Sequence, residues 1–422
     1  MRRRNFLILS GSGLAAAGLA ACGGGSGGGD GNSVEVFTWW AAGSEKVGLD
    51  ALVEVFNEQY PDIEFINGAV AGGAGSAAKD MLQSRLQAGD PPDTFQAHAG
   101  AELTDYIDAG QILDVSDVYD ELGLREAFPD ALLERLTADG AIYSVPSNIH
   151  RSNVVWGSAA ALTEAGIDPS TPPATMDEFL EQLDALDAAG VRPMSIGAAW
   201  TQVNLLEAIL MADLGAAAYN GLFDGSTAWD SAEVTTALEH FQTMIGHTNT
   251  DRDGLDWPDA TQQLIDGTAA YNVMGDWAVA AFDEAGLAPT DDYVYFELPG
   301  ADKIFGFLAD SFTLPDGAPN PEGTRAWLDT ISSPDGQLAF NLAKGSIPAR
   351  TDVDTAEFPE YQQTALTSFA EDEICSSIAH GAATSVGWLN SISDATSQFT
   401  TGATDLAAYQ QALADIAAEN LA

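Results

Sequence analysis

The strongest constraint on the fold is an alternation of strand and helix patterns near the start of the body of the chain. Residues 34–38, 63–67 and 94–98 have the short apolar pattern of strands and are bounded by turn residues. Between them, apolar side chains recur at helical spacing over 49–56, and a second helix is predicted over 77–88. Strand, helix, strand, helix, strand is the pattern of a parallel sheet, so an α/β fold is predicted.

Polar and aromatic residues stand at the ends of these predicted strands. Trp39 and Trp40 follow the first strand, and Gln96 and His98 end the third. In open α/β sheets, ligands bind in the crevice outside the carboxyl ends of the strands. Neighbouring indoles on a strand would project to opposite sides, and an indole face suits the C–H face of a sugar ring. Core packing is the alternative role for the two tryptophans.

Later segments predict further elements of the same class. Asp139-Gly140 predicts a tight hairpin turn, and helices are predicted over 176–189 and 234–245. Strand character returns over 305–315. A chain of 422 residues exceeds the size at which one core keeps growing, so at least two lobes, joined by several crossings, are predicted.

The amino-terminal residues have the features of an export signal. Residues 1–21 begin with Arg2, Arg3 and Arg4 and continue with a short apolar stretch rich in Gly and Ala. This stretch is too short to span a bilayer, so we expect it to be removed. The paired arginines favour the twin-arginine route, and an ordinary secretory signal or a retained anchor are the alternatives.

Small residues precede Cys22 in the pattern of a lipoprotein signal. The Cys22 thiol is therefore predicted to carry lipid, which would hold the protein on the outer face of the cytoplasmic membrane, on its extracellular or periplasmic side. Residues 22–32 are too rich in Gly to pack a core and would form a tether. The globular part is predicted to start near Ser33.

The charge of the chain excludes several functions. A net charge of −48 excludes nucleic acid as a partner. Disorder is excluded because 46% of the residues are apolar and 9% are aromatic, which is enough to form cores. An acidic surface with only four lysines repels itself unless salt screens it, so the composition indicates a halophilic protein. Once Cys22 carries lipid, Cys375 has no partner for an internal disulfide.

Further residues have side chains suited to a polar ligand. Trp277 and Trp257 are candidate aromatic contacts, and Gly275 indicates that some group approaches the backbone closely before a helix. Charged or planar polar groups at the ends of predicted elements could bind sugar hydroxyls in a closed cleft; solvated surface is the alternative role for each of them. They are Glu45, Gln96, His98, Asp310, Lys344 and His380.

Eight segments together resemble the glucose- and mannose-binding proteins of bacterial ABC importers, within the family 1 extracellular solute-binding proteins of the maltose-binding-protein type. The resemblance covers nearly the whole mature chain in the same order. The segments are 37–40 (Phe-Thr-Trp-Trp), 72–75 (Gly-Gly-Ala-Gly), 89–100, 145–154, 272–278 (Asn-Val-Met-Gly-Asp-Trp-Ala), 310–312 (Asp-Ser-Phe), 344–350 (Lys-Gly-Ser-Ile-Pro-Ala-Arg) and 379–382 (Ala-His-Gly-Ala).

The resemblance implies a two-lobed α/β binding-protein fold of type II, with a ligand cleft between lobes that three hinge crossings connect. The hinges would fall near Pro146, Pro299 and Ser346. It implies a monomer that closes on a small sugar and delivers it to the membrane subunits of an ABC permease, with no cofactor and no metal. The implied lobes are 33–146 with 300–345, and 147–299 with 346–422.

The resemblance also implies which residues hold the sugar. One residue more than in the family pattern separates Trp40 from Glu45, and some relatives carry lysine where this chain has His98. These departures put the position of Glu45 and the hydroxyl preference in doubt. The implied sugar contacts are Trp39, Trp40, Glu45, Gln96, His98, Trp277, Asp310, Lys344 and His380.

Three other functions remain open from the residues alone. A glycoside hydrolase would place two carboxylates, such as Glu45 and Asp310, across a sugar, but no motif fixes their separation. The five histidines lack the spacing typical of a metal site, and residues 249–254 resemble only the start of a calcium loop. A disaccharide or another small polar solute on the same scaffold is the third alternative.

Overall fold

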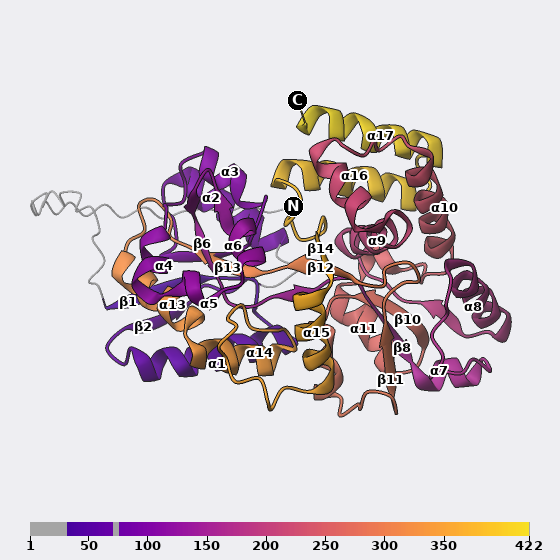
Figure 1. Cartoon of the computed structure of the whole chain (residues 1–422), viewed down its shortest axis with the longest axis horizontal. Coiled ribbons are helices and arrows are strands. Elements are labelled where there is room, and N and C mark those ends of the chain that lie inside the picture. The colour runs from indigo at the N-terminus through magenta and orange to yellow at the C-terminus, as the bar shows by residue number, and fades with distance from the viewer. Residues whose placement is uncertain (1–31, 71–75, 422) are drawn as a thin grey trace, which may run out of the picture.

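The computed structural model describes residues 32–70 and 76–421, which form two α/β lobes side by side (Figure 1). The first lobe contains most of the amino-terminal third of the chain, and the second contains the middle of the chain and the last two helices. The predicted signal, Cys22, most of the tether and the Gly72–Gly75 segment lie outside the described residues.

The first lobe is built on a five-stranded sheet. Its first three strands in chain order are parallel, as predicted, because each helical crossover returns the chain in the same direction. The two later strands are antiparallel to their neighbours. In spatial order the strands are β2 (Glu64–Asn67), β1 (Ser33–Phe37), β3 (Thr94–His98), β13 (Asp310–Thr313) and β6 (Ser144–Pro146).

Helices cover this sheet because each has one apolar face. In α1 the side chains of Leu49, Leu52 and Phe56 recur at helical spacing and are fully buried. A small hairpin, β4 (Thr137–Ala138) and β5 (Ala141–Ile142), turns at Asp139 and Gly140, whose φ angles of 51° and 85° match the predicted turn. The helices are α1 (Gly43–Gln59), α2 (Ser76–Ala88), α3 (Leu103–Asp108), α4 (Ser116–Leu122), α5 (Leu124–Ala127), α6 (Asp130–Leu136), α13 (Pro321–Ser332) and α14 (Pro334–Lys344).

The second lobe is built on a four-stranded mixed sheet surrounded by helices. In spatial order its strands are β11 (Tyr293–Phe296), β8 (Val154–Ser158), β10 (Ala269–Met274) and β9 (Arg192–Met194). Helix α8 has the predicted bounds, and α10 differs from its prediction by two residues or fewer at each end. The helices are α7 (Ala159–Glu164), α8 (Met176–Ala189), α9 (Ala199–Asp224), α10 (Ala232–Gly246), α11 (Trp257–Ile265), α12 (Ala278–Glu284), α16 (Val386–Thr400) and α17 (Leu406–Asn420), with a 3₁₀ turn over Arg252–Gly254.

Helix α9 is the core helix of this lobe. Among the described residues it alone is long and apolar enough to cross a membrane, but 67% of its most apolar stretch is buried inside the protein. Gly215 interrupts it with a φ of 72°, which kinks the helix because that conformation suits only glycine.

A third sheet lies where the chain passes between the lobes. It contains β14 (Glu373–Ser376), β12 (Ile304–Leu308) and β7 (His150–Arg151), and α15 (Glu360–Glu371) packs near it. The chain leaves β6 for β7, leaves β12 for β13 at Ala309, and passes back after α14, where Ile347 pairs with Ile149. The predicted lobe boundaries stay a prediction, although the partners of β12 favour a second crossing at Ala309 and not near Pro299.

Candidate functional site

A cavity between the lobes brings together side chains from segments far apart in the sequence. Its unfilled space measures about 340 Å³, counting the part that opens to solvent, which is small for a ligand pocket. Eight of the nine residues predicted as sugar contacts line it, and Gln96 does not. The lining residues are Trp39, Trp40, Glu45, His98, His150, Trp200, Trp257, Trp277, Leu308, Asp310, Lys344 and His380.

Both tryptophans of the tandem pair reach the cavity. β1 ends at Phe37 and the chain bends at Trp39, so the alternation of side chains in an extended strand does not apply to this pair. The Trp40 ring lies 4.7 Å from the ring of Phe340 and 5.6 Å from that of Phe312, so core aromatics hold it in place. The Trp39 ring lies 5.0 Å from the ring of His98 and is more weakly enclosed.

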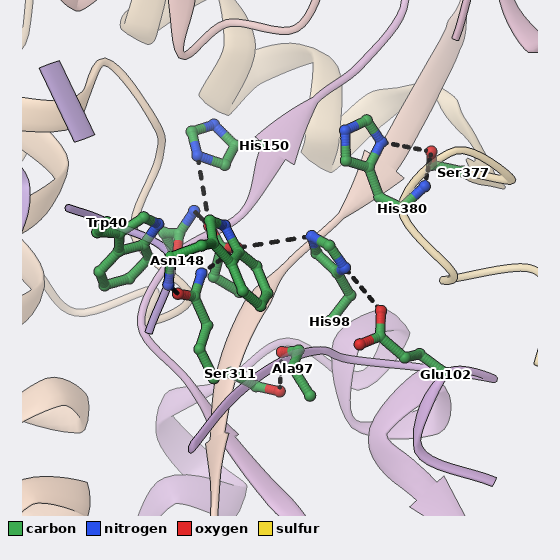
Figure 2. A network of polar contacts seen from close by, with 12 residues as sticks. Trp40, Ala97, His98, Glu102, Asn148, His150, Ser311, Ser377 and His380 are labelled. Carbon is green, nitrogen blue, oxygen red and sulfur yellow. Dashed lines mark hydrogen bonds and ion pairs between the residues drawn. The ribbon is translucent and has the colours of Figure 1, made fainter. Parts of the chain in front are cut away.

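Asp310 is the polar centre of the cavity and begins β13. Its Oδ1 accepts a hydrogen bond of 2.9 Å from the Gln96 amide, and its Oδ2 accepts one of 3.1 Å from the Asn148 amide. The Gln96 carbonyl in turn accepts from Thr38 and from the backbone of Trp39. Gln96 therefore lies behind Asp310 and fixes its orientation, where a direct ligand contact was predicted. Figure 2 shows Asn148 and the histidines around this centre.

Lys344 and Glu45 form an ion pair between two neighbouring helices of the first lobe, α14 and α1. Lys344 ends α14, is 1% exposed, and has its Nζ 3.6 Å from Glu45 Oε1. Enclosure raises the pKa of the Glu45 carboxyl above its usual value, and the Lys344 ammonium opposes that rise. The extra residue before Glu45 therefore does not remove this side chain from the cavity.

Aromatic rings from the second lobe form the opposite wall. The Trp277 ring lies 4.9 Å from the His380 ring and 6.2 Å from the Trp200 ring. A side chain at Gly275 would place its Cβ 2.1 Å from the Trp277 ring, so the group that approaches Gly275 closely is this indole. Trp257, at the start of α11, completes the wall. Trp200 lacked a local signal because it begins the apolar run of α9, where a core role explains a tryptophan equally well.

Two cavity histidines lie between pairs of carboxylates. His98 Nδ1 is 2.7 Å from Glu102 and its Nε2 is 3.8 Å from Asp310. His150 Nδ1 bonds Asp276, and its Nε2 is 3.6 Å from the other Asp310 oxygen. His150 lies in the 145–154 motif, yet sequence reasoning did not select it, because a lone histidine on a short strand has a core role at least as often.

The third cavity histidine is in a different environment. His380 Nδ1 lies 2.8 Å from the hydroxyl of Ser377 (Figure 2), and no carboxylate among residues 32–70 and 76–421 forms a hydrogen bond with the ring. Burial lowers the pKa of His380 well below its usual value, and the neighbouring side chains of His98, Lys79 and His150 lower that pKa further. At neutral pH the His380 ring is therefore uncharged.

The two lobes touch beside this cavity. The backbone N–H groups of Ala101 and Glu102 donate to the carbonyls of Ala382 and Gly381, at 3.2 and 2.8 Å. A Cβ at Gly100 would lie 2.6 Å from the Ala382 carbonyl oxygen. The structure is thus a closed arrangement in which loop 379–386 rests on the segment that follows β3.

Within the described residues, no group of three or more His, Cys, Asp or Glu side chains has a geometry that could hold a metal ion. Outside the cavity, His240 pairs with Asp213 and His247 with Asp187. Residues 249–254 end in the 3₁₀ turn Arg252–Gly254, and the Asn249 side chain accepts a hydrogen bond from the backbone N–H of Ile196. The cavity itself offers carboxylate, ammonium and imidazole groups that can form hydrogen bonds, set among aromatic rings.

Comparisons with known proteins agree with this arrangement. Residues 42–338 match the bacterial extracellular solute-binding protein family, so the chain belongs to that family of solute-binding, non-enzymatic transport components. An ABC transporter extracellular-binding protein of Pyrococcus horikoshii is 33% identical over 87% of this chain and 83% of its own length. A xylose/arabinose-binding protein of Haloferax volcanii is 30% identical over 83% of this chain and 77% of its own length.

Solved structures show the same fold. A chitin oligosaccharide binding protein superposes with a TM-score of 0.81 at 21% identity, over 93% of this chain and all of that one. A maltose-bound protein of Thermotoga maritima superposes with a TM-score of 0.73 at 18% identity, over 92% of this chain and 99% of that one. The predicted two-lobed α/β binding-protein fold is confirmed. The family consists of ABC transporter components, and its named members include sugar-binding proteins.

Proposed function

We propose that this protein is the substrate-binding lipoprotein of an ABC sugar importer and that it takes a monosaccharide such as glucose or mannose. The observation that carries the proposal is the cavity, which indoles from both lobes line and where Asp310, Lys344 and His380 offer hydrogen bonds within about 340 Å³. A pyranose ring has apolar C–H faces and a rim of hydroxyls, which this combination complements.

In this proposal, closure of the lobes around the sugar is what the permease recognises. The sugar stabilises the closed form only if it binds that form more tightly than the open one. Stacking on Trp277 from one lobe and hydroxyl bonds to Asp310 and Lys344 from the other would give this difference. The permease would then recognise the closed, monomeric protein, which lipid on Cys22 keeps at the outer face of the membrane.

A disaccharide or another small polar solute is the second candidate. A larger hollow of about 960 Å³, again counting its open part, lies beside the cavity and shares Trp200 with it. Its other walls carry polar groups of both lobes, including Lys79, Glu102 and Asn390. A second sugar unit could occupy this space if the ring of Trp200 moves.

The test is a calorimetric titration of residues 33–422 in molar salt. The panel contains glucose, mannose, galactose and xylose, with maltose and trehalose as disaccharides. Tighter binding of a monosaccharide supports the proposal, and tighter binding of a disaccharide favours the second candidate. Binding of amino acids or peptides with no sugar bound would overturn both. Release of reducing sugar from aryl glycosides would identify an enzyme instead.

A further inference from the structure

A buried carboxylate outside the cavity holds the loop that carries His380. Glu207 lies on α9 and is fully buried. Its Oε2 accepts hydrogen bonds from the backbone N–H groups of Ile378 and Ala379, at 2.6 and 2.9 Å. The Ser377 hydroxyl lies 2.9 Å from each carboxylate oxygen. Glu207 thus fixes three consecutive residues immediately before His380.

Ser377 connects this carboxylate to the cavity histidine. Its Oγ lies 2.8 Å from His380 Nδ1, and it accepts a bond of 3.2 Å from the His380 backbone N–H (Figure 2). A serine hydroxyl has one proton to donate and can accept two hydrogen bonds. Its single proton can therefore go to Glu207 or to His380, but not to both.

Counting protons settles which ring nitrogen of His380 carries hydrogen. An ionised Glu207 only accepts, so the Ser377 proton goes to it and Ser377 must accept from Nδ1–H. The ring is uncharged and has one N–H group, so Nε2 is left with a free lone pair. Within the described part of the chain, no side chain or backbone group bonds this Nε2, and His380 lines the cavity.

We propose that Glu207 is a positioning residue which, through Ser377, keeps His380 in the Nδ1–H form, so that Nε2 accepts a hydrogen bond from a hydroxyl group of the ligand. The ligand must then present an O–H to His380, whereas an ether or carbonyl oxygen at that point would face a lone pair. The proton arrangement follows from the protein alone. Its role in recognition rests on the sugar-binding function proposed above.

Protonation of Glu207 reverses the arrangement. The Nδ1 proton passes to Ser377 as Ser377 passes its own proton to Glu207, and one proton from solvent binds Nε2. Burial raises the pKa of Glu207 to about 7, although hydrogen bonds from Ala379 and Ser377 oppose that rise. Nε2 therefore accepts above about pH 7 and donates below it. Affinity for a ligand that donates to Nε2 should fall as the pH falls through 7.

The other titratable groups facing Glu207 do not change charge in this range. Tyr219, on the same helix, and Cys375, on β14, are the titratable side chains that interact with its charge. Burial raises the pKa of Tyr219 well above its usual value, and burial raises that of Cys375 to about 12. Both stay neutral between pH 6 and 8, so of these three groups only Glu207 changes its charge in that range.

The first test uses the protein without ligand. Nitrogen-15 NMR of the histidine rings at pH 8 distinguishes the Nδ1–H form of a neutral ring from the Nε2–H form. The pair of signals that is lost in His380→Gln belongs to His380. Wild type is expected in the Nδ1–H form. In Glu207→Gln the amide oxygen can accept from the backbone while its NH₂ donates to Ser377, so the Nε2–H form is expected. The same form in both proteins would overturn the proposal.

Two further variants serve as a control and as an alternative in case Glu207→Gln does not fold. Glu419→Gln, an exposed substitution on α17, is the matched control and should leave the His380 signals unchanged. If Glu207→Gln fails to fold, Ser377→Ala removes the relay directly, and a mixture of both ring forms is expected. A single Nδ1–H form in Ser377→Ala would show that Ser377 does not select it.

The second test adds D-glucose, with calorimetry at pH 8 and pH 6. Wild type is expected to lose at least fivefold in affinity at the lower pH, whereas Glu207→Gln should be at least tenfold weaker at pH 8 and insensitive to pH. Unchanged affinity in a variant whose ring form has reversed would overturn the acceptor role of Nε2. Absence of binding to every sugar would overturn the proposed function and leave the NMR result standing.

Discussion

At the residue scale, the cavity separates side chains that face the ligand from side chains that hold them. Gln96 and His98 lie on the same face of β3, but Gln96 is two residues earlier, roughly 7 Å deeper along the strand. Its amide therefore reaches Asp310 and not the cavity. The sequence pattern identifies the face on which a residue lies, but not the depth at which it lies.

Removing one of the central contacts should weaken binding without unfolding the protein. Trp277→Ala removes a stacking surface and Lys344→Ala removes a buried charge, so each should cost at least tenfold in sugar affinity, or about 1.4 kcal/mol. Calorimetry with the tightest-binding sugar of the panel measures the loss, and thermal melting checks the fold. Lys303→Ala, at a lysine that is 74% exposed, is the control. Unchanged affinity in both variants would place the site elsewhere.

Glu102 predicts a pH dependence of stability. Burial alone would raise the pKa of its carboxyl, but Lys79 and His98 lower it to about 2. A lowered pKa means that the ionised form stabilises the fold above the unfolded value of 4.5, and that this stabilisation is lost as the pH falls from 4.5 to 2.

Wild type should therefore exceed Glu102→Gln in stability by about 3 kcal/mol at pH 7 and by little near pH 2. Urea unfolding of both proteins in molar salt at a series of pH values measures the difference. Glu419→Gln serves as the exposed control. A difference that does not change with pH would mean that Glu102 contributes by packing and not by charge.

At the element scale, local sequence patterns predict where helices and strands lie better than they predict which strands pair with each other. The Asp139-Gly140 turn, α8 and the parallel order of β1, β2 and β3 follow from short-range signals. By contrast, β12 pairs with β7 and β14, which are more than sixty residues away on either side. Nothing in the local sequence states which sheet an apolar strand joins, so the assignment of residues 300–345 to the first lobe came from the resemblance alone.

The contact between the two loops offers a test of closure. Gly100→Ala adds a methyl group 2.6 Å from the Ala382 carbonyl and should keep the lobes from closing fully. We expect weaker sugar binding and a larger radius of gyration with sugar in small-angle X-ray scattering. Gly110→Ala is the matched control, because Gly110 also has a positive φ but has open space around its Cβ. Equal effects in both variants would assign the loss to backbone strain.

At the scale of the whole molecule, the main feature is the large excess of negative charge. With 63 acidic residues against 15 basic ones, repulsion across the surface opposes the compact state. The cavity is different, because Lys344 and three histidines occur together in it. There the Lys344 ammonium pairs with Glu45 and the His380 ring is uncharged, so the cavity suits a ligand without net charge.

Stability should rise with salt because counter-ions screen this repulsion at a Debye length of about 3 Å near 1 M. Thermal melting of residues 33–422 from 0.1 to 3 M KCl is expected to show a rising midpoint. Sucrose at matched osmolality is the control, because it is excluded from the protein surface but does not screen charge. A midpoint that is flat from low to molar salt would remove the halophilic interpretation.

The sequence by itself determined the fold class and the family, and it named most of the residues that the cavity brings together. Strand–helix alternation is a local property, and indoles and polar groups at strand ends are visible without a structure. The tertiary structure decided which groups meet. Asp310 contacts Asn148 and Gln96 across 162 and 214 residues, and Glu207 reaches Ser377 across 170. Such contacts depend on how helices and sheets pack against each other, a property that no short stretch of sequence contains.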